Sequence, residues 1–205
     1  MPRHRDRSRP TADEGFTLIE MLVAALLFSL IFMIIAAIFI ASLGVQQTVT
    51  DTTSATVDAQ LAAQSIDKGV KNAVGVELTG DPGAPAGLPA DDQMLVAEVA
   101  TGDGDPDSIV YNCQAWYFDA SAGEIRWRVT ALAEVAAPSA AQLAGWTLLA
   151  DRVTATVPPS VFTHSGASIG VAYRTTVDEN SPVAIEFTTA SLLGAPLDES
   201  TSTCF

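Results

Sequence analysis

The sequence is poor in the residues that carry most enzyme and metal chemistry. Among 205 residues it has two histidines, His4 and His164, and two cysteines, Cys113 and Cys204. It contains no neighbouring histidine pair, no CxxC or HExxH motif, no glycine-rich phosphate loop and no nucleophile elbow. We therefore expect no enzymatic activity, no catalytic residue and no resident cofactor. The ordinary interpretation of His164, which precedes Ser165 and a glycine, is an exposed turn residue.

Positively charged residues are also scarce, and they are unevenly distributed. The chain has 10 Lys and Arg residues against 24 Asp and Glu residues, which gives a formal net charge of −14. Four of the basic residues, Arg3, Arg5, Arg7 and Arg9, lie in the first ten positions, so from Phe16 onward six basic residues face 21 acidic ones. An acidic body of this kind repels phosphate backbones. We therefore expect no direct nucleic-acid binding.

One long apolar run dominates the N-terminal quarter of the chain. Residues 21–45 form a stretch of 25 residues with no charge, no amide side chain and no proline. At 1.5 Å per residue, a helix of that length covers the roughly 30 Å hydrocarbon core of a membrane. The run is longer than the apolar core of about 7–15 residues in a cleaved secretory signal. The arginines before it predict a single-pass membrane helix with the N-terminus in the cytoplasm and the C-terminal domain outside.

A glutamate lies directly before this run, at the end of the hexapeptide Gly-Phe-Thr-Leu-Ile-Glu that spans Gly15 to Glu20. A charge costs a few kcal/mol at the bilayer centre and less near its edge, and a plain anchor gains nothing from it. The hexapeptide, the apolar run and the basic leader together resemble the cleavage and methylation motif of type IV prepilins and type II secretion pseudopilins. The resemblance covers about thirty residues at the N-terminus.

The resemblance implies a processing route and roles for three residues. A prepilin peptidase, which is also the methylase, would cut between Gly15 and Phe16 and would methylate the new amino group of Phe16. The Glu20 carboxylate would then pair with the N-terminal amine of a neighbouring pilin or pseudopilin subunit, because an unpaired charge in low dielectric is costly. The other implied partners are the inner-membrane assembly platform and the membrane lipid. The alternative is that Glu20 is an interfacial carboxylate that reaches toward water.

Within this family the sequence favours a minor pilin or a pseudopilin. Major pilins often have a proline that loosens the helix inside the span, where this chain has Ala37. Near the outer end of the span, Gly44 is the residue that weakens the helix. The order of the later strands, with the segment Leu148-Leu-Ala-Asp-Arg-Val153, is similar to PilW-like or J-type minor subunits. The two alternatives are a major pilus subunit and a membrane-anchored extracellular binding module that does not assemble.

Beyond Gly44 the hydrophobic pattern becomes amphipathic. Small, apolar and threonine residues recur at spacings of three and four, namely at Val45, Val49, Thr52, Thr56, Ala59, Ala63, Ile66, Val70 and Ala73. No proline interrupts the chain between residues 16 and 81. We therefore predict one helix from about Thr17 to about Val74, with the threonine-rich stretch 48–56 as its weakest part.

A Gly- and Pro-rich linker at residues 79–92 separates this helix from a region whose hydrophobic period is two. Strands are predicted at 94–100, 109–117, 125–129, 146–157, 169–177 and 183–193, with a hairpin turn at 119–123. The predicted fold class is α+β, with a long N-terminal helix packed on a C-terminal antiparallel sheet domain. The predicted organisation is a leader at 1–15, a membrane and assembly helix at 16–45, an amphipathic continuation at 46–75 and an exterior domain at 76–205.

Two further candidate sites lie in this β-rich region. Cys113 and Cys204 could form a disulfide in an oxidising exterior, or they could remain two thiols. Asp103, Asp105 and Asp107 alternate in one short stretch and could supply oxygen ligands to Ca²⁺, although the stretch lacks the closing glutamate of a helix-loop-helix calcium site. The alternative for the three aspartates is an acidic turn.

Overall fold

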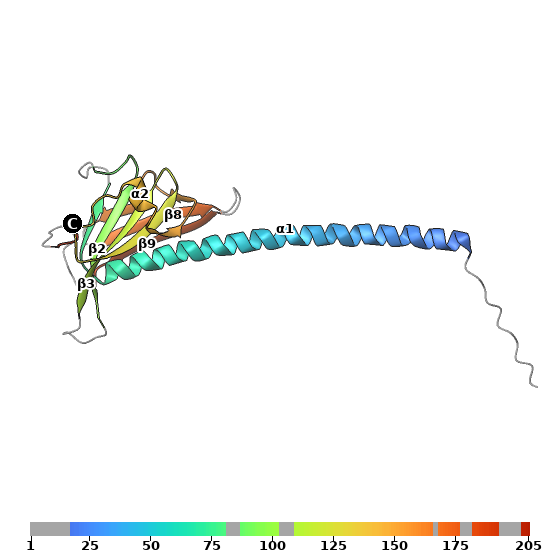
Figure 1. Cartoon of the computed structure of the whole chain (residues 1–205), viewed down its shortest axis with the longest axis horizontal. Helices are drawn as coiled ribbons and strands as arrows, with labels where there is room; N and C mark the ends of the chain where they lie inside the picture. Colours follow the sequence, from blue (N-terminus) through green and yellow to red (C-terminus); the bar gives the residue numbers. More distant parts are fainter. Residues whose placement is uncertain (1–16, 81–86, 103–108, 166–167, 177–181, 193–201) are drawn as a thin grey trace, which may run out of the picture. The chain divides into compact units, whose positions relative to one another are not determined.

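The computed structural model describes residues 17–80, 87–102, 109–165, 168–176, 182–192 and 202–205. The chain divides into two compact units, Met1–Thr48 and Val49–Phe205. The described part of the first unit is the N-terminal part of one long helix, and the second unit contains the end of that helix together with two antiparallel sheets (Figure 1). The predicted α+β fold class is confirmed.

Helix α1 extends over Leu18–Lys71. The predicted helix is confirmed except at its C-terminal end, which lies a few residues earlier than expected. The chain turns at Asn72, whose carbonyl accepts a hydrogen bond from the backbone of Ala100 at 3.1 Å. Strand β1, Ala73–Thr79, follows at once and pairs with β2. The strand partner therefore overrides a helical pattern that local propensity alone would extend to Val74.

The first sheet has five strands in the order β1-β2-β3-β4-β5, and all its pairings are antiparallel. After β1 these are β2 (Gln93–Thr101), β3 (Val110–Asp119), β4 (Glu124–Ala131) and β5 (Thr147–Ala150). The predicted hairpin turn between β3 and β4 is confirmed. It uses Gly123 at φ 65°, a left-handed conformation that glycine adopts without steric cost.

The second sheet contains β6 (Val153–Ala155), β7 (Phe162–Ser165), β8 (Ser168–Thr176) and β9 (Pro182–Ala190). Strands β6 and β7 pair with different halves of β8, and β9 pairs with β8 along its whole length. The predicted single strand 146–157 is wrong, because the chain leaves the first sheet after Ala150 and enters the second at Val153. Arg152 between them has φ 52°, which breaks the extended backbone.

The main core lies where the end of α1 meets both sheets. Ala59, Ala62, Ile66 and Val70 of α1 are fully buried there. They pack with side chains from both sheets, among them Leu95, Trp116, Phe118, Ile125, Phe162, Val171 and Tyr173. A second cluster on the opposite face of the first sheet contains Met94, Val96, Cys113, Ala115, Tyr117, Val135, Leu143, Trp146 and Cys204. The short helix α2, Ala140–Leu143, contributes Leu143 to this second cluster.

Candidate functional site

The start of α1 is closed by a reciprocal contact between Thr17 and Glu20. The Glu20 backbone N–H donates to the Thr17 hydroxyl at 3.4 Å, and the Thr17 backbone N–H and hydroxyl both lie 3.4 Å from the Glu20 carboxylate. This is the arrangement of a capping box, in which each residue's side chain accepts a hydrogen bond from the other residue's backbone N–H. A carboxylate in the first turn also interacts favourably with the helix dipole. The expectation that an anchor gains nothing from Glu20 is therefore wrong, because Glu20 has a partner within its own chain.

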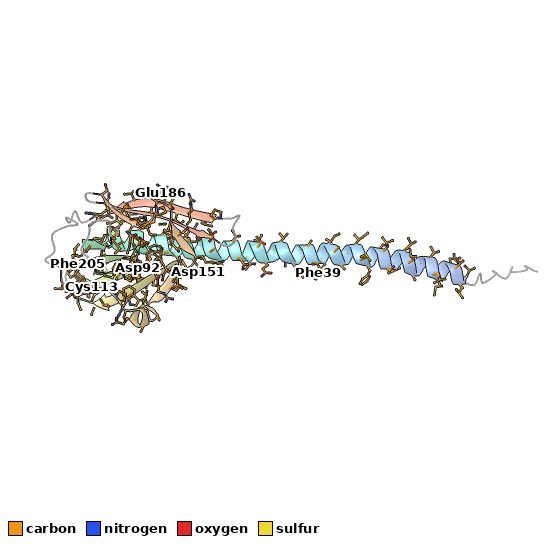
Figure 2. The ribbon with its side chains drawn as sticks, turned by 90° about the horizontal axis from the view of Figure 1, so that it is seen from above. Phe39, Asp92, Cys113, Asp151, Glu186 and Phe205 are labelled. Carbon is orange, nitrogen blue, oxygen red and sulfur yellow. A yellow bond between two sulfur atoms is a disulfide. The ribbon has the colours of Figure 1, made fainter. Side chains whose placement is uncertain are left out.

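From Leu18 to Thr50, all residues of α1 are exposed. Their side chains project into the surroundings, as the 64% exposed Phe39 illustrates (Figure 2). Exposed apolar surface on this scale is unfavourable in water and marks contact with a membrane or another protein. By length and composition this part of α1 could span a membrane. Glu20 is the one charged residue between residues 17 and 50.

The predicted amphipathic stripe of α1 is buried in its second half and exposed in its first half. Val45 and Val49 are exposed, whereas burial begins at Ala55 and continues through Ala59 and Ile66. The residues of α1 that pack are mainly alanines and a glycine, which a hydrophobicity pattern registers weakly. Small side chains let the sheets approach the helix backbone closely.

Trp116 makes the closest of these approaches. Its indole lies against Gly69 so tightly that a Cβ atom built on Gly69 would overlap the ring. The indole N–H donates to the Ser65 hydroxyl at 2.9 Å, one helical turn away. Six residues before Ser65, the Tyr173 hydroxyl donates to the carbonyl of Ala59 at 2.6 Å. Two aromatic residues, one from each sheet, therefore hold α1 through both packing and hydrogen bonds.

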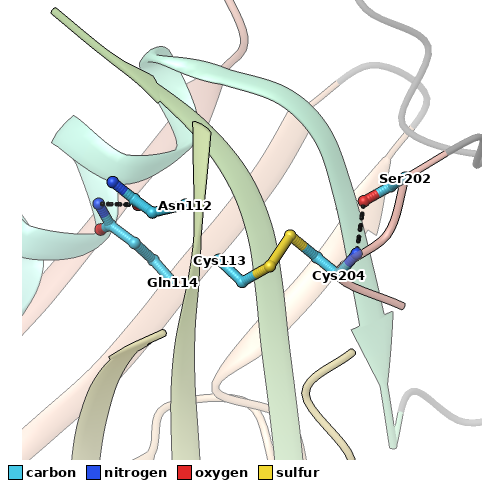
Figure 3. The surroundings of a disulfide bond; sticks show 5 residues. All are labelled: Asn112, Cys113, Gln114, Ser202 and Cys204. Carbon is cyan, nitrogen blue, oxygen red and sulfur yellow. Dashed lines mark hydrogen bonds between the residues drawn. A yellow bond between two sulfur atoms is a disulfide. The ribbon is translucent and has the colours of Figure 1, made fainter. Parts of the chain in front are cut away.

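Cys113 and Cys204 form a disulfide in the structure (Figure 3). Their Cα atoms are 5.5 Å apart, and both residues are fully buried. The Cys204 carbonyl also accepts a hydrogen bond from the backbone of Val135 at 2.8 Å. Its N–H donates to the Ser202 hydroxyl at 3.0 Å. The disulfide thus attaches residues 202–205 to the central strand β3, and the hydrogen bond from Val135 attaches them to the loop that precedes α2.

Several predicted site residues lie outside the described residues. These are Gly15 and Phe16 at the expected cleavage position, and Asp103, Asp105 and Asp107 of the expected calcium loop. Within the part of the chain that the structure describes, no group of three or more His, Cys, Asp or Glu side chains could hold a metal ion. His164 is exposed, as expected, but it lies on strand β7 and not in a turn.

Two buried polar residues at the start of β2 connect segments that are far apart in the sequence. Asp92 accepts hydrogen bonds from the Tyr117 hydroxyl and, at 2.8 Å, from the backbone of Ala120. Burial, followed by the hydrogen bond to Asp92 and the nearby carboxylate charge, raises the pKa of Tyr117 above its ordinary value. Gln93 accepts from the backbones of Val161 and Phe162 at 2.6 and 2.9 Å, and so joins the two sheets.

Sequence reasoning missed some of these contacts for different reasons. The Thr17–Glu20 box has a readable signature, a threonine followed three residues later by glutamate just before an apolar run. The packing of Trp116 on Gly69 and the hydrogen bonds of Gln93 have no local signature, because their partners lie 47 to 69 positions away.

No family model, no curated protein and no solved structure matches this chain.

Proposed function

We propose that the chain is a minor pilin or pseudopilin subunit of a type IV pilus or a type II secretion-like filament, and not an enzyme. A prepilin peptidase cuts it between Gly15 and Phe16 and methylates Phe16. The mature protein rests in the cell membrane through residues 21–45 with its C-terminal domain outside. The inner-membrane platform then assembles it with other subunits through the N-terminal helix.

The observation that carries this proposal is the contrast between the two parts of α1. Residues from Ala55 onward pack into a core with two sheets, whereas the apolar residues from Leu18 to Val49 have no partner among the described residues. Lipid alone can cover such a surface, and so can a bundle of equivalent helices in a filament. The Glu20 carboxylate at the start of the apolar part supports the filament bundle, because its contacts with Thr17 are to neutral groups and a neighbouring amine would compensate its charge.

Two other functions remain as alternatives. A major pilus subunit would have the same N-terminal half, and its abundance on sheared fibres would separate it from a minor subunit. A membrane-anchored binding module would use the sheet domain alone and would not require the Glu20 charge.

Replacing Glu20 by glutamine separates the charge of this residue from its role as a helix cap. Glutamine supports a capping box in this same chain, where Ser139 and Gln142 close the start of α2. We expect Glu20→Gln to insert into the membrane normally but to fall at least about tenfold in sheared filaments, because an unpaired amine in low dielectric costs well over 1.4 kcal/mol. The measurement is quantitative immunoblotting of membrane and filament fractions.

Thr17→Ala is the matched control, since it weakens the cap but retains the Glu20 charge. We expect this variant to appear in filaments at near wild-type levels. If Glu20→Gln assembles normally and Thr17→Ala does not, the carboxylate acts as a helix cap and the filament proposal is wrong. In every variant, N-terminal sequencing should begin at N-methylated Phe16, and a protein that begins at Met1 would also contradict the proposal.

A further inference from the structure

A small pocket lies on the face of the first sheet that carries the second hydrophobic cluster. Its volume is about 210 Å³, and it is lined by Arg128 and Thr130 of β4, the loop 134–138, Gln142 of α2 and Trp146. Thr130 is paired with Cys113, which places it on that face. Sites for drug-sized ligands have volumes of about 300–1,000 Å³. This pocket is therefore suited to one functional group on a short stem.

Most polar side chains that line the pocket can donate a hydrogen bond, and Glu134 is the exception. The Trp146 indole N–H and the Thr130 hydroxyl are buried and have no hydrogen-bond partner among the residues described. Trp146 is only 5% exposed, so its N–H carries an uncompensated desolvation cost. The Gln142 side-chain oxygen is occupied by Ser139, with two contacts of 2.9 Å, so its amide nitrogen is the end that can still donate.

Two arginines of β4 point to the same face, but they have different partners. Arg126 forms an ion pair with Glu124 at 2.8 Å and donates to the Trp146 carbonyl at 3.2 Å. Arg128 is exposed, and no ion pair or hydrogen bond engages it within the described ranges. A guanidinium group with its donors unused is well suited to a planar oxyanion.

We propose that this pocket binds a carboxylate carried on a short apolar stem. Arg128 provides the charge, and Trp146 and Thr130 belong to the same lining. The walls contributed by Val135, Ala136, Ala137 and Pro138 accommodate the stem. A doubly charged phosphate fits less well, because Glu134 lies in the same lining and the whole chain carries −14. This inference does not depend on the filament proposal.

The test uses the full chain in detergent micelles, labelled with ¹⁵N, and observes the indole N–H resonances of its tryptophans. Sodium butyrate is titrated against its neutral counterpart butyramide at constant ionic strength. We expect a saturable shift of the Trp146 resonance with butyrate and none with butyramide. N-acetyl-glutamate amide forms a third arm. Tighter binding of this compound than of butyrate indicates an acidic side chain of a protein as the natural source, and weaker binding indicates a free short-chain acid.

Two charge variants and one control make the result specific. Arg128→Gln should weaken butyrate binding by about tenfold or more, because a charge-assisted hydrogen bond is lost. Glu134→Gln should strengthen it by removing a like charge. Arg174→Gln, which removes an exposed arginine from β8 in the other sheet, should leave it unchanged. The proposal is overturned if butyrate gives no saturable shift, if butyramide binds equally well, or if the Arg128 and Arg174 variants behave alike.

Discussion

At the scale of single residues, Gly69 determines how closely α1 can approach the first sheet. Alanine normally favours a helix by about 1 kcal/mol over glycine. At this position the added methyl group would overlap the Trp116 ring, which is itself held by the hydrogen bond to Ser65. Overpacking of a tight core usually costs about 1–3 kcal/mol. The steric cost therefore exceeds the gain in helix propensity.

We predict that Gly69→Ala lowers the free energy of unfolding of the C-terminal domain by about 1–2 kcal/mol. The measurement is urea denaturation followed by tryptophan fluorescence. Gly44→Ala is the matched control in the same helix, because a Cβ atom there meets no other atom within 4 Å. An equal effect of the two substitutions would show that Trp116 does not restrict the helix.

Two buried tyrosines make the domain sensitive to high pH. Burial raises the pKa of Tyr173 above its ordinary value of 10.0, and burial with the Asp92 contact does the same for Tyr117. A raised pKa in the folded state means that the unfolded chain loses its tyrosine protons first. Their contribution to stability is therefore complete well below pH 10 and is lost progressively as the pH rises through 10 toward the raised pKa of the folded state.

We predict that the unfolding free energy is nearly constant from pH 8 to pH 9.5 and then falls by up to about 1.4 kcal/mol per pH unit for each buried tyrosine. Tyr173→Phe should remove the contribution of one tyrosine proton from this slope. The variant also loses the hydrogen bond to Ala59, so its unfolding free energy should be lower at every pH. Denaturation curves at several pH values provide both numbers. A slope that is the same in the variant would exclude Tyr173 as a source.

At the scale of elements, the disulfide connects parts of the chain that are far apart in the sequence. It joins β3 to the segment 202–205 across 91 positions. Closing a loop of that length stabilises a fold by about 4–5 kcal/mol in the chain-entropy model. The hydrogen bond between Val135 and Cys204 adds the loop before α2 to the same connection.

We predict that the double substitution Cys113→Ala with Cys204→Ala lowers the unfolding free energy by about 3–5 kcal/mol, and that reduction of the wild-type protein has a similar effect. Alkylation without reductant should label no cysteine in the wild-type protein. Two labels before reduction would show that the bridge is absent. No loss of stability in the double variant would show that hydrogen bonds and packing hold the segment without it.

At the scale of the whole molecule, the two units differ in what they require from their surroundings. The compact unit Val49–Phe205 contains all the buried residues of the described chain. The described residues of the first unit are exposed from Leu18 to Val45 and are mostly apolar. Glu20 is the one charged residue among them. The second unit should therefore keep its own core when the first unit is removed.

We predict that a fragment beginning at Val49 folds as a soluble monomer, with an unfolding midpoint within a few degrees of the same domain in the full chain. Size-exclusion chromatography, circular dichroism and thermal unfolding check this directly. The full chain should require detergent or lipid to remain monodisperse. An unfolded or aggregated fragment would show that the domain needs the first part of α1.

The sequence by itself determined the features that depend on local pattern and on total hydrophobicity. An uninterrupted apolar run determines a helix whose apolar side chains are unfavourable in water. Period-two alternation with a glycine turn determines the β3–β4 hairpin. The same reasoning located β2, β8 and β9 to within about three residues. The family resemblance and the roles of Gly15, Phe16 and Glu20 also come from the sequence, and they remain proposals.

Only the tertiary structure decided where the helix gives way to β1, where one predicted strand divides between two sheets, and where along α1 burial begins. The physical reason is that each of these outcomes depends on a distant partner: β2 for β1, β8 for β6, and Trp116 and Tyr173 for the small residues of α1. Alanine and glycine carry little hydrophobic signal of their own. Their burial is set by the aromatic rings that the sheets bring to them.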